Sequence, residues 1–92
     1  MTLHIVSQSP YHGSALKECL NYIAEDDTLL LIGEGVYSCQ GEAAELINTL
    51  SCPVFVLATD RVARGIKTKL PDVDYAGFVT LTSTHNKSIS WF

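Results

Sequence analysis

Short apolar runs recur along the chain at the length of β-strands. They occupy residues 3–6, 28–32 and 54–58, and polar residues, glycine or proline stand beside them. Uninterrupted apolar runs of this length are typical of strands that are covered on both faces, as in parallel sheets. A short fourth strand near Val73 and an alternating strand at residues 88–92 complete the predicted sheet.

The segments between the strands carry apolar residues at helical spacing. Leu16, Cys19, Leu20 and Ile23 fall at i, i+3, i+4 and i+7, which makes one apolar face of a first helix. Ser14 is predicted as the N-cap of this helix, because its hydroxyl can accept a bond from an orphan backbone N–H. Further helices are predicted at residues 42–50, 60–64 and 75–82.

Acidic residues and glycines mark where these elements begin and end. The acidic run at residues 25–27 is predicted to close the first helix as a solvated turn. Gly33 and Gly35 permit a sharp turn at the end of the second strand. Asp60 is predicted as the N-cap of the third helix, and Gly65 as the residue that ends it.

The alternation of strands and helices with short links predicts an α/β fold. We expect one domain over residues 1–92, with a small parallel sheet of about four to five strands and helices on both faces, in a flavodoxin-like three-layer arrangement. In such a sheet, binding sites lie beyond the carboxyl ends of the strands. That rim is predicted to comprise residues 7–13, 33–41 and 59–64.

The composition limits the classes of function. Of the 92 residues, 47% are hydrophobic and only 17% are charged, against about 25% charged residues in ordinary domains. A chain this small and sparsely charged is expected to bury part of its surface against other subunits. The net charge of −4 and the pI of about 5.1 argue against direct binding to nucleic acid, which needs a basic surface.

The sequence predicts neither export nor membrane insertion. The N-terminus lacks the basic and apolar segments of a signal peptide, and the longest apolar run, at residues 29–32, is too short to span a bilayer. The three cysteines, Cys19, Cys39 and Cys52, are odd in number and lack metal-type spacing. A cytoplasmic protein with free thiols is therefore expected.

Motifs for cofactors and metals are weak. The glycine turn at residues 33–35 lacks the third glycine of a dinucleotide fingerprint, and it follows the second strand rather than the first. His4, His12 and His85 lie on different predicted elements, so no zinc site is predicted. The sequence also lacks the serine motif of an α/β-hydrolase. We therefore predict no cofactor and no metal.

The cysteines are the candidate nucleophiles. Cys52 starts the third strand, opposite the rim, where a structural role is expected, whereas Cys39 lies on the rim side after the second strand. Cys19 lies on the apolar face of the first helix, where free cysteines most often serve as buried packing residues. A reactive thiol needs a nearby cation or helix N-terminus to stabilise its thiolate, and Lys17 points off that face.

Several segments together resemble one protein family. They are "LHIVSQSP", "LLLIGEGVY", "VLATDRVARG" and "VDYAGFVTLTSTHNKSISWF", which follow in this order and cover nearly the whole chain. The most specific parts are D-x-x-A-R-G at residues 60–65, D-Y-x-x-F-V at residues 74–79 and the near-terminal Trp91. On these motifs the chain resembles the DsrH/TusB family, the smallest partners in the DsrEFH and TusBCD sulfur-relay complexes.

This resemblance implies a DsrE-like fold and a hetero-hexamer with DsrE/TusD-like and DsrF/TusC-like subunits. It also implies a part in passing persulfide sulfur between proteins. In the TusBCD branch the sulfur goes toward 2-thiouridine at the wobble position of transfer RNA, and in the DsrEFH branch it serves dissimilatory sulfur oxidation. The principal sulfur acceptor of these complexes belongs to the DsrE/TusD subunit.

Within the family, the DsrH branch carries a cysteine in the first helix, in a context like that of Cys19, and TusB-like members often lack it. The resemblance therefore makes Cys19 a candidate sulfur carrier. Its thiolate would attack the outer sulfur of a donor persulfide and become a persulfide itself, and an acceptor thiol would then take that sulfur.

Two alternatives stay open at this point. One is a small-molecule or nucleotide-binding regulatory module, which the predicted rim and the glycine turn support. The other is a purely structural subunit of the relay complex, in which Cys19 is core packing. Uptake of a sulfur atom by Cys19 would distinguish the carrier from the structural subunit. Stabilisation of the protein by added nucleotides would distinguish the binding module from both.

Overall fold

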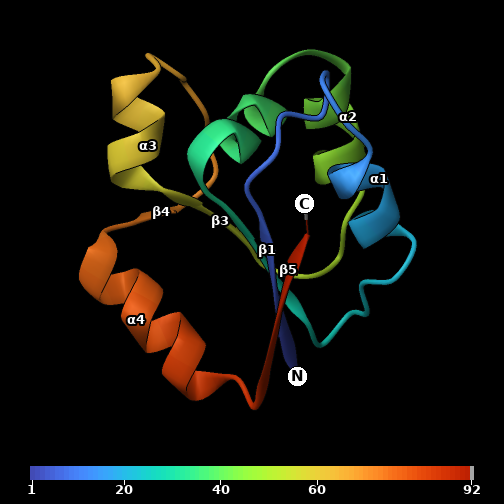
Figure 1. Ribbon diagram of the computed structural model, residues 1–92, viewed down its shortest axis with the longest axis vertical. Helices are drawn as coiled ribbons and strands as arrows, with labels where there is room; N and C mark the ends of the chain where they lie inside the picture. Colours follow the sequence, from blue (N-terminus) through green and yellow to red (C-terminus); the bar gives the residue numbers. More distant parts are fainter. Residues whose placement is uncertain (92) are drawn as a thin grey trace.

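The computed structural model describes residues 1–91 and contains a five-stranded parallel sheet in the order β4-β3-β2-β1-β5 (Figure 1). The α/β class, the parallel sheet and the helices on both of its faces confirm the predicted fold. No helix in this part of the chain is long and apolar enough to cross a membrane. In chain order the elements are β1 (Thr2–Val6), α1 (Ala15–Leu20), β2 (Thr28–Leu31), η1 (Gly33–Cys39), α2 (Gly41–Asn48), β3 (Val54–Leu57), α3 (Ala58–Ala63), β4 (Asp72–Val73), α4 (Tyr75–Thr84) and β5 (Lys87–Trp91).

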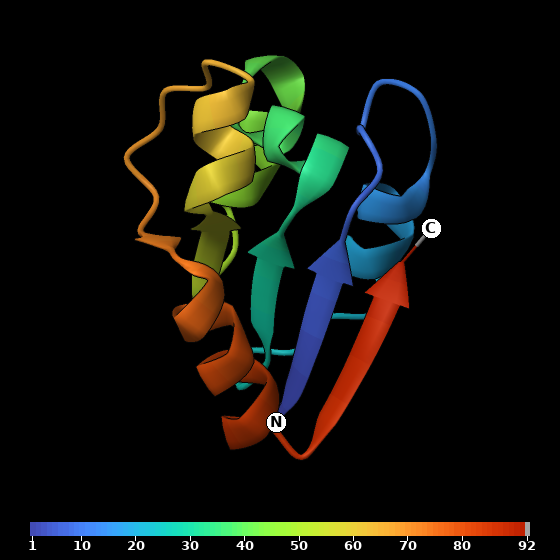
Figure 2. The same cartoon turned by 60° about the vertical axis from the view of Figure 1, so that its left-hand side comes forward.

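The two faces of the sheet are covered to different extents. α1 and α2 pack on one face, where Leu31 and Val56 are fully buried. α4 lies on the opposite side of the sheet from α1 (Figure 2) and covers a smaller cluster of Leu3, Ile5 and Leu30. Burial of each such side chain contributes roughly 1.5–3 kcal/mol. The core therefore lies mainly between the sheet and the α1–α2 layer.

The chain continues from β2 as a 3-10 helix, η1, where the sequence predicts only a sharp turn. Gly33 adopts a φ of 51°, a conformation that favours glycine. Gly35 lies against β1, because a Cβ atom at this position would stand 2.1 Å from the carbonyl oxygen of Val6. Glycine at this position thus lets η1 approach the carboxyl end of β1.

Of the two predicted helix caps, the position of Ser14 is confirmed but its capping bond is absent, and the cap at Asp60 is wrong. Ser14 occupies the N-cap of α1, but its side chain makes no capping bond. Instead, Gln8 Oε1 accepts a hydrogen bond of 3.3 Å from the N–H of Ala15. Asp60 lies within α3, which begins at Ala58, and its carboxylate accepts a hydrogen bond from Gly33 N–H at the start of η1 instead of capping its own helix.

The acidic turn before β2 is predicted to be solvated, which is wrong for Asp27, since this residue is only 7% exposed. Asp27 Oδ1 accepts a hydrogen bond from Thr2 N–H at 2.9 Å, and Oδ2 accepts one from Ala24 N–H at 3.0 Å. His4 Nε2 lies 2.9 Å from the same Oδ2. Burial disfavours the charged carboxylate, but these hydrogen bonds outweigh it and lower the pKa of Asp27 to about 2.

The indole of Trp91 extends this arrangement to the C-terminal strand. Trp91 Nε1–H donates to His4 Nδ1 at 3.1 Å, and the two rings stack with centroids 6.0 Å apart. Because Nδ1 accepts, the proton of the His4 ring lies on Nε2 and is donated to Asp27. We call Asp27, His4 and Trp91 the buried polar chain. It links β1, the turn before β2 and β5.

Candidate functional site

The segments that follow β1, β2 and β3, namely a loop, η1 and α3, lie at one end of the sheet, as predicted (Figure 1). Asp60 joins two of them, because its Oδ2 accepts a 2.7 Å hydrogen bond from Gly33 N–H. Arg64 lies 3.8 Å from the other carboxylate oxygen of Asp60 and donates to its backbone oxygen at 3.3 Å. Gly65 ends α3 with a φ of 63°, as predicted. The D-x-x-A-R-G run therefore holds the rim together.

Arg61 performs a similar function for the segment that follows α3. Its Nε and Nη2 donate to Asp72 Oδ2 at 3.1 and 2.7 Å, and its Nη1 donates to the backbone oxygen of Ile66 at 3.1 Å. These bonds tie both ends of the connection between α3 and β4 to one guanidinium. The middle of that connection, residues 68–71, faces α2 across a pocket.

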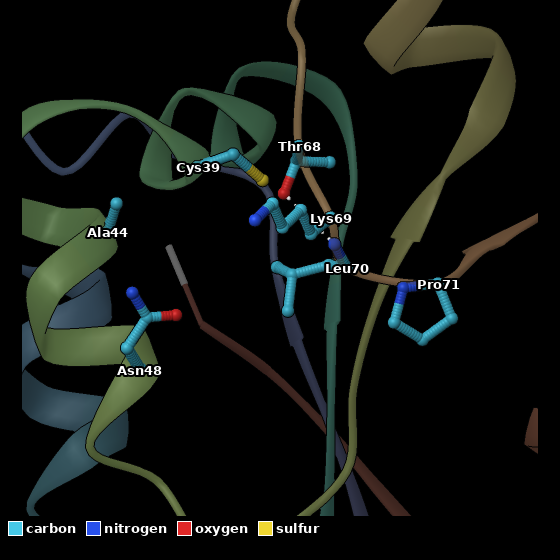
Figure 3. A pocket seen from close by; sticks show the side chains of 7 residues that line it. All are labelled: Cys39, Ala44, Asn48, Thr68, Lys69, Leu70 and Pro71. Atoms are coloured by element: carbon cyan, nitrogen blue, oxygen red, sulfur yellow. Dashed lines mark hydrogen bonds between the residues drawn. The ribbon is translucent and has the colours of Figure 1, made fainter.

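This pocket has a volume of about 300 Å³ and is open to solvent on one side. Figure 3 shows the Cys39 sulfur, at the end of η1, pointing toward the Thr68 hydroxyl, with the amide of Asn48 on the α2 side. The Thr68 hydroxyl oxygen also accepts a 3.2 Å hydrogen bond from Leu70 N–H. The residues around the pocket are Cys39, Ala44, Asn48, Thr68, Lys69, Leu70 and Pro71.

A second pocket of about 350 Å³ adjoins the first along α2 and the start of β3. The two pockets share Asn48, Leu70 and Pro71, and Cys52 lines the second one. We call the pair of pockets the thiol groove, because a cysteine lies in each. The sequence does not predict this groove, since residues 68–71 meet α2 only through tertiary packing.

The three thiols differ in access, since Cys19 and Cys52 are buried and Cys39 is partly exposed. Cys19 is fully buried, and burial, together with nearby Cys52 and Asp27, raises the pKa of its thiol to about 12. Cys39 is half-buried. Burial raises the pKa of the Cys39 thiol, while the Thr68 hydroxyl and the Arg61 guanidinium act in the opposite direction. Among the described cysteines, Cys39 therefore combines solvent access with groups that favour its thiolate.

The histidines and acids are not arranged for metal chemistry. Within residues 1–91, no group of three or more His, Cys, Asp or Glu side chains is placed to hold a metal ion. His4 belongs to the buried polar chain, and His12 is exposed on the rim. His85 Nε2 lies 2.9 Å from the hydroxyl of Thr28, and its Nδ1 lies 2.7 Å from the Leu81 carbonyl oxygen. These contacts give two of the histidines structural roles.

Solved structures with a similar fold include those of the two following proteins. The crystal structure of the ychN protein from E. coli superposes with a TM-score of 0.75, covering 98% of each chain at 17% identity. The solution structure of protein Tm0979 from Thermotoga maritima gives a TM-score of 0.70, covering 92% of this chain and 94% of that one at 24% identity. At these identities, the two likenesses establish the fold.

Sequence comparison gives the family. Residues 8–88 match the family described as DsrH like protein. Proteins named TusB from Yersinia pestis (strain Pestoides F) and Yersinia pseudotuberculosis (serotype O:1b) are each 35% identical to this chain, over 97% of its length and 99% of theirs. The motif-based resemblance is confirmed, and this chain belongs to the DsrH family of sulfur-relay subunits.

Proposed function

We propose that this chain is a single-domain, cytoplasmic subunit of a TusBCD-like sulfur-relay complex that supports 2-thiolation of the transfer-RNA wobble uridine. The observation that carries the proposal is the match to proteins named TusB over nearly the whole of both chains. That match favours the transfer-RNA branch over dissimilatory sulfur oxidation. The expected partners are a DsrE/TusD-like and a DsrF/TusC-like subunit, in a hetero-hexamer.

The surface chemistry of the chain supports an indirect role in this pathway. The net charge is −4, and two of the six basic side chains, Arg61 and Arg64, are already engaged with Asp72 and Asp60. A nucleic-acid-binding surface needs free cations to neutralise phosphates. The chain therefore acts on transfer RNA through its partners and does not contact the RNA itself.

For Cys19, the burial favours a packing role over sulfur transfer. A thiol pKa of about 12, against an ordinary value of 9.0, leaves roughly a thousandfold less thiolate at neutral pH. Persulfide exchange requires both thiolate and access for the donor sulfur, and this fully buried side chain has neither. Transfer through Cys19 would require α1 to open when a partner docks.

Complementation of a gene deletion tests both points. The deletion strain is expected to lose 2-thiouridine from its transfer RNA, measured by mass spectrometry of digested nucleosides. Wild-type chain and Cys19→Ala are both expected to restore it, because alanine removes the sulfur without burying a hydroxyl. Unchanged 2-thiouridine in the deletion strain would refute the proposed pathway. Failure of a folded Cys19→Ala chain would instead establish Cys19 as a carrier.

The thiol groove gives some support to the alternative of a small-molecule-binding module. Its two pockets, of about 300 and 350 Å³, are each at the lower end of the size that small ligands occupy. A thermal-shift survey with nucleotides and flavins tests this alternative. Stabilisation that is lost in Asn48→Leu, which changes a residue shared by both pockets, would favour the module.

A further inference from the structure

The first pocket of the thiol groove places a nucleophile among groups that bind small polar molecules. Figure 3 shows the Cys39 sulfur directed into the space between η1, α2 and residues 68–71, and the Lys69 side chain extends toward the same side of the pocket. The hydroxyl of Thr68 and the amide of Asn48 complete the polar lining. Four different functional groups thus surround one cavity of about 300 Å³ that is open to solvent.

Cys39 is the thiol of this groove that a solute can reach. Its side chain is partly exposed, whereas Cys52 in the adjoining pocket is only 8% exposed and Cys19 is fully buried. The rate of exchange at a sulfur atom depends on access as well as on the thiolate fraction. A small electrophile from solution is therefore expected to react with Cys39 first.

The Thr68 hydroxyl is placed to stabilise a thiolate at Cys39. Its oxygen accepts a 3.2 Å hydrogen bond from Leu70 N–H, which leaves the hydroxyl hydrogen free to be donated to the sulfur. Burial raises the pKa of the Cys39 thiol, and Thr68 and the Arg61 guanidinium offset part of that rise. Because a thiolate of higher pKa is also the stronger nucleophile, exchange slows less than the thiolate fraction falls.

The pocket is larger than the transfer of a sulfur atom alone requires. A cavity of about 300 Å³ lies at the lower end of the size that small ligands occupy, and it far exceeds a single sulfur atom. Ala44 and Leu70 supply apolar contact, and the Asn48 amide supplies hydrogen bonding. The pocket therefore fits a reagent whose organic part stays next to Cys39 after the reaction.

Charge selects among such reagents. The chain carries a net charge of −4, which disfavours anions in general, but Lys69 supplies a cation at this pocket. Arg61 is paired with Asp72, so its charge is largely neutralised. Glu45, which follows Ala44 in α2, is exposed and does not line the pocket. An ammonium group beside the thiol favours a reagent that carries carboxylate groups.

We propose that Cys39 and its pocket form a site of reversible S-thiolation by a small disulfide that carries carboxylate groups. The Cys39 thiolate attacks one sulfur of the disulfide, so that a new S–S bond forms and the S–S bond of the reagent breaks. The departing thiolate leaves with the electron pair and takes a proton from water. The disulfide is thus the oxidant and Cys39 is oxidised, and an excess of free thiol reverses the step. Lys69 holds a carboxylate of the half that stays.

The test measures exchange on the purified chain with two disulfides. Glutathione disulfide carries carboxylates, whereas bis(2-hydroxyethyl) disulfide carries no charge. Mass-spectrometric mapping gives the rate at each cysteine. Glutathione is expected on Cys39 at least about tenfold faster than on Cys52 or Cys19, because access differs, and dithiothreitol should remove it.

Two pairs of variants examine the lining of the pocket. Lys69→Gln is expected to slow glutathione disulfide about threefold, the effect of losing one exposed ion pair, without slowing the neutral disulfide. Lys67→Gln is the matched control, because it removes the same charge from an exposed residue that does not line the pocket, and both rates should stay unchanged. Thr68→Val should slow both disulfides, and Thr68→Ser, which keeps the hydroxyl, should restore both rates. Melting temperature verifies that each variant folds.

Three results would overturn the proposal. They are modification of Cys52 or Cys19 as fast as Cys39, equal effects of the two lysine variants, and equal slowing of both disulfides by Lys69→Gln. The inference does not depend on the proposed function, because the assay contains no partner and no transfer RNA. Its outcome is therefore separate from that of the complementation experiment.

Discussion

The buried polar chain makes a quantitative prediction about stability. Replacing Asp27 by Asn keeps the shape of the side chain but removes the charge that Thr2 N–H, Ala24 N–H and the His4 ring stabilise. Folding lowers the pKa of Asp27 from 3.8 to about 2. At about 1.4 kcal/mol per pKa unit, Asp27→Asn should lose roughly 2 kcal/mol of unfolding free energy at pH 7.

The pH dependence follows from the direction of this shift. Because the pKa of Asp27 is lowered on folding, the contribution of the carboxylate is fully present above its unfolded value of 3.8. It is lost as the pH falls through about 2, since the carboxylate is then protonated in the folded state as well. Wild type and Asp27→Asn should therefore converge in stability between these two pH values.

Urea denaturation followed by tryptophan fluorescence measures the effect. Trp91 is the single tryptophan of the chain and donates to His4, so its emission reports the buried polar chain directly. Unfolding free energies of wild type and variant are compared at pH 7 and at several lower values. A difference below about 0.5 kcal/mol at pH 7, the usual range for surface substitutions, would refute the reasoning. A difference that does not change as the pH falls would also refute it.

Three further predictions concern packing, capping and thiol access. Gly35→Ala should lower the free energy of unfolding, measured by urea denaturation, by about 2 kcal/mol or more, because its Cβ would stand 2.1 Å from the Val6 carbonyl oxygen. An unchanged free energy of unfolding would contradict this close approach. Tyr11→Phe should lower the free energy of unfolding by about 1 kcal/mol in the same assay. The Tyr11 hydroxyl donates to the Gln40 carbonyl and accepts from Ala43 N–H in the first turn of α2, and phenylalanine removes both bonds. An unchanged urea midpoint would exclude this capping role. Mass-spectrometric mapping of native alkylation at pH 7 should find Cys39 modified well before Cys19, and the reverse order would invalidate the assigned burial.

The sequence predicts the layers of this fold because hydrophobic periodicity records them locally. The runs at residues 3–6, 28–32 and 54–58 match β1, β2 and β3 to within one residue at each end, and the short strand near Val73 is β4. Each prediction needs only neighbouring residues and the rule that strands joined through helices run parallel. The strand predicted at residues 88–92 is β5 (Lys87–Trp91) as far as residue 91, and residue 92 lies outside the described residues.

The errors arise where distant segments meet. Asp27 resembles a solvated acid until β1 brings His4 within 2.9 Å of it. Asp60 resembles a helix cap until Gly33 N–H reaches its carboxylate. The thiol groove depends on the connection between α3 and β4, which Arg61 holds through Ile66 and Asp72. The spacing of residues along the sequence gives no sign of these contacts. The family resemblance covers these positions, but it does not reveal their contacts.

The central claim is that this chain functions only within a sulfur-relay assembly. Native mass spectrometry of the tagged chain, purified after co-expression with the DsrE/TusD-like and DsrF/TusC-like chains of its genome, tests it most directly. The account predicts one assembly that contains all three chains, with two copies of each. The account would be contradicted if the tagged chain were observed alone, while the other two chains formed a complex with each other in the fraction that the tag does not retain.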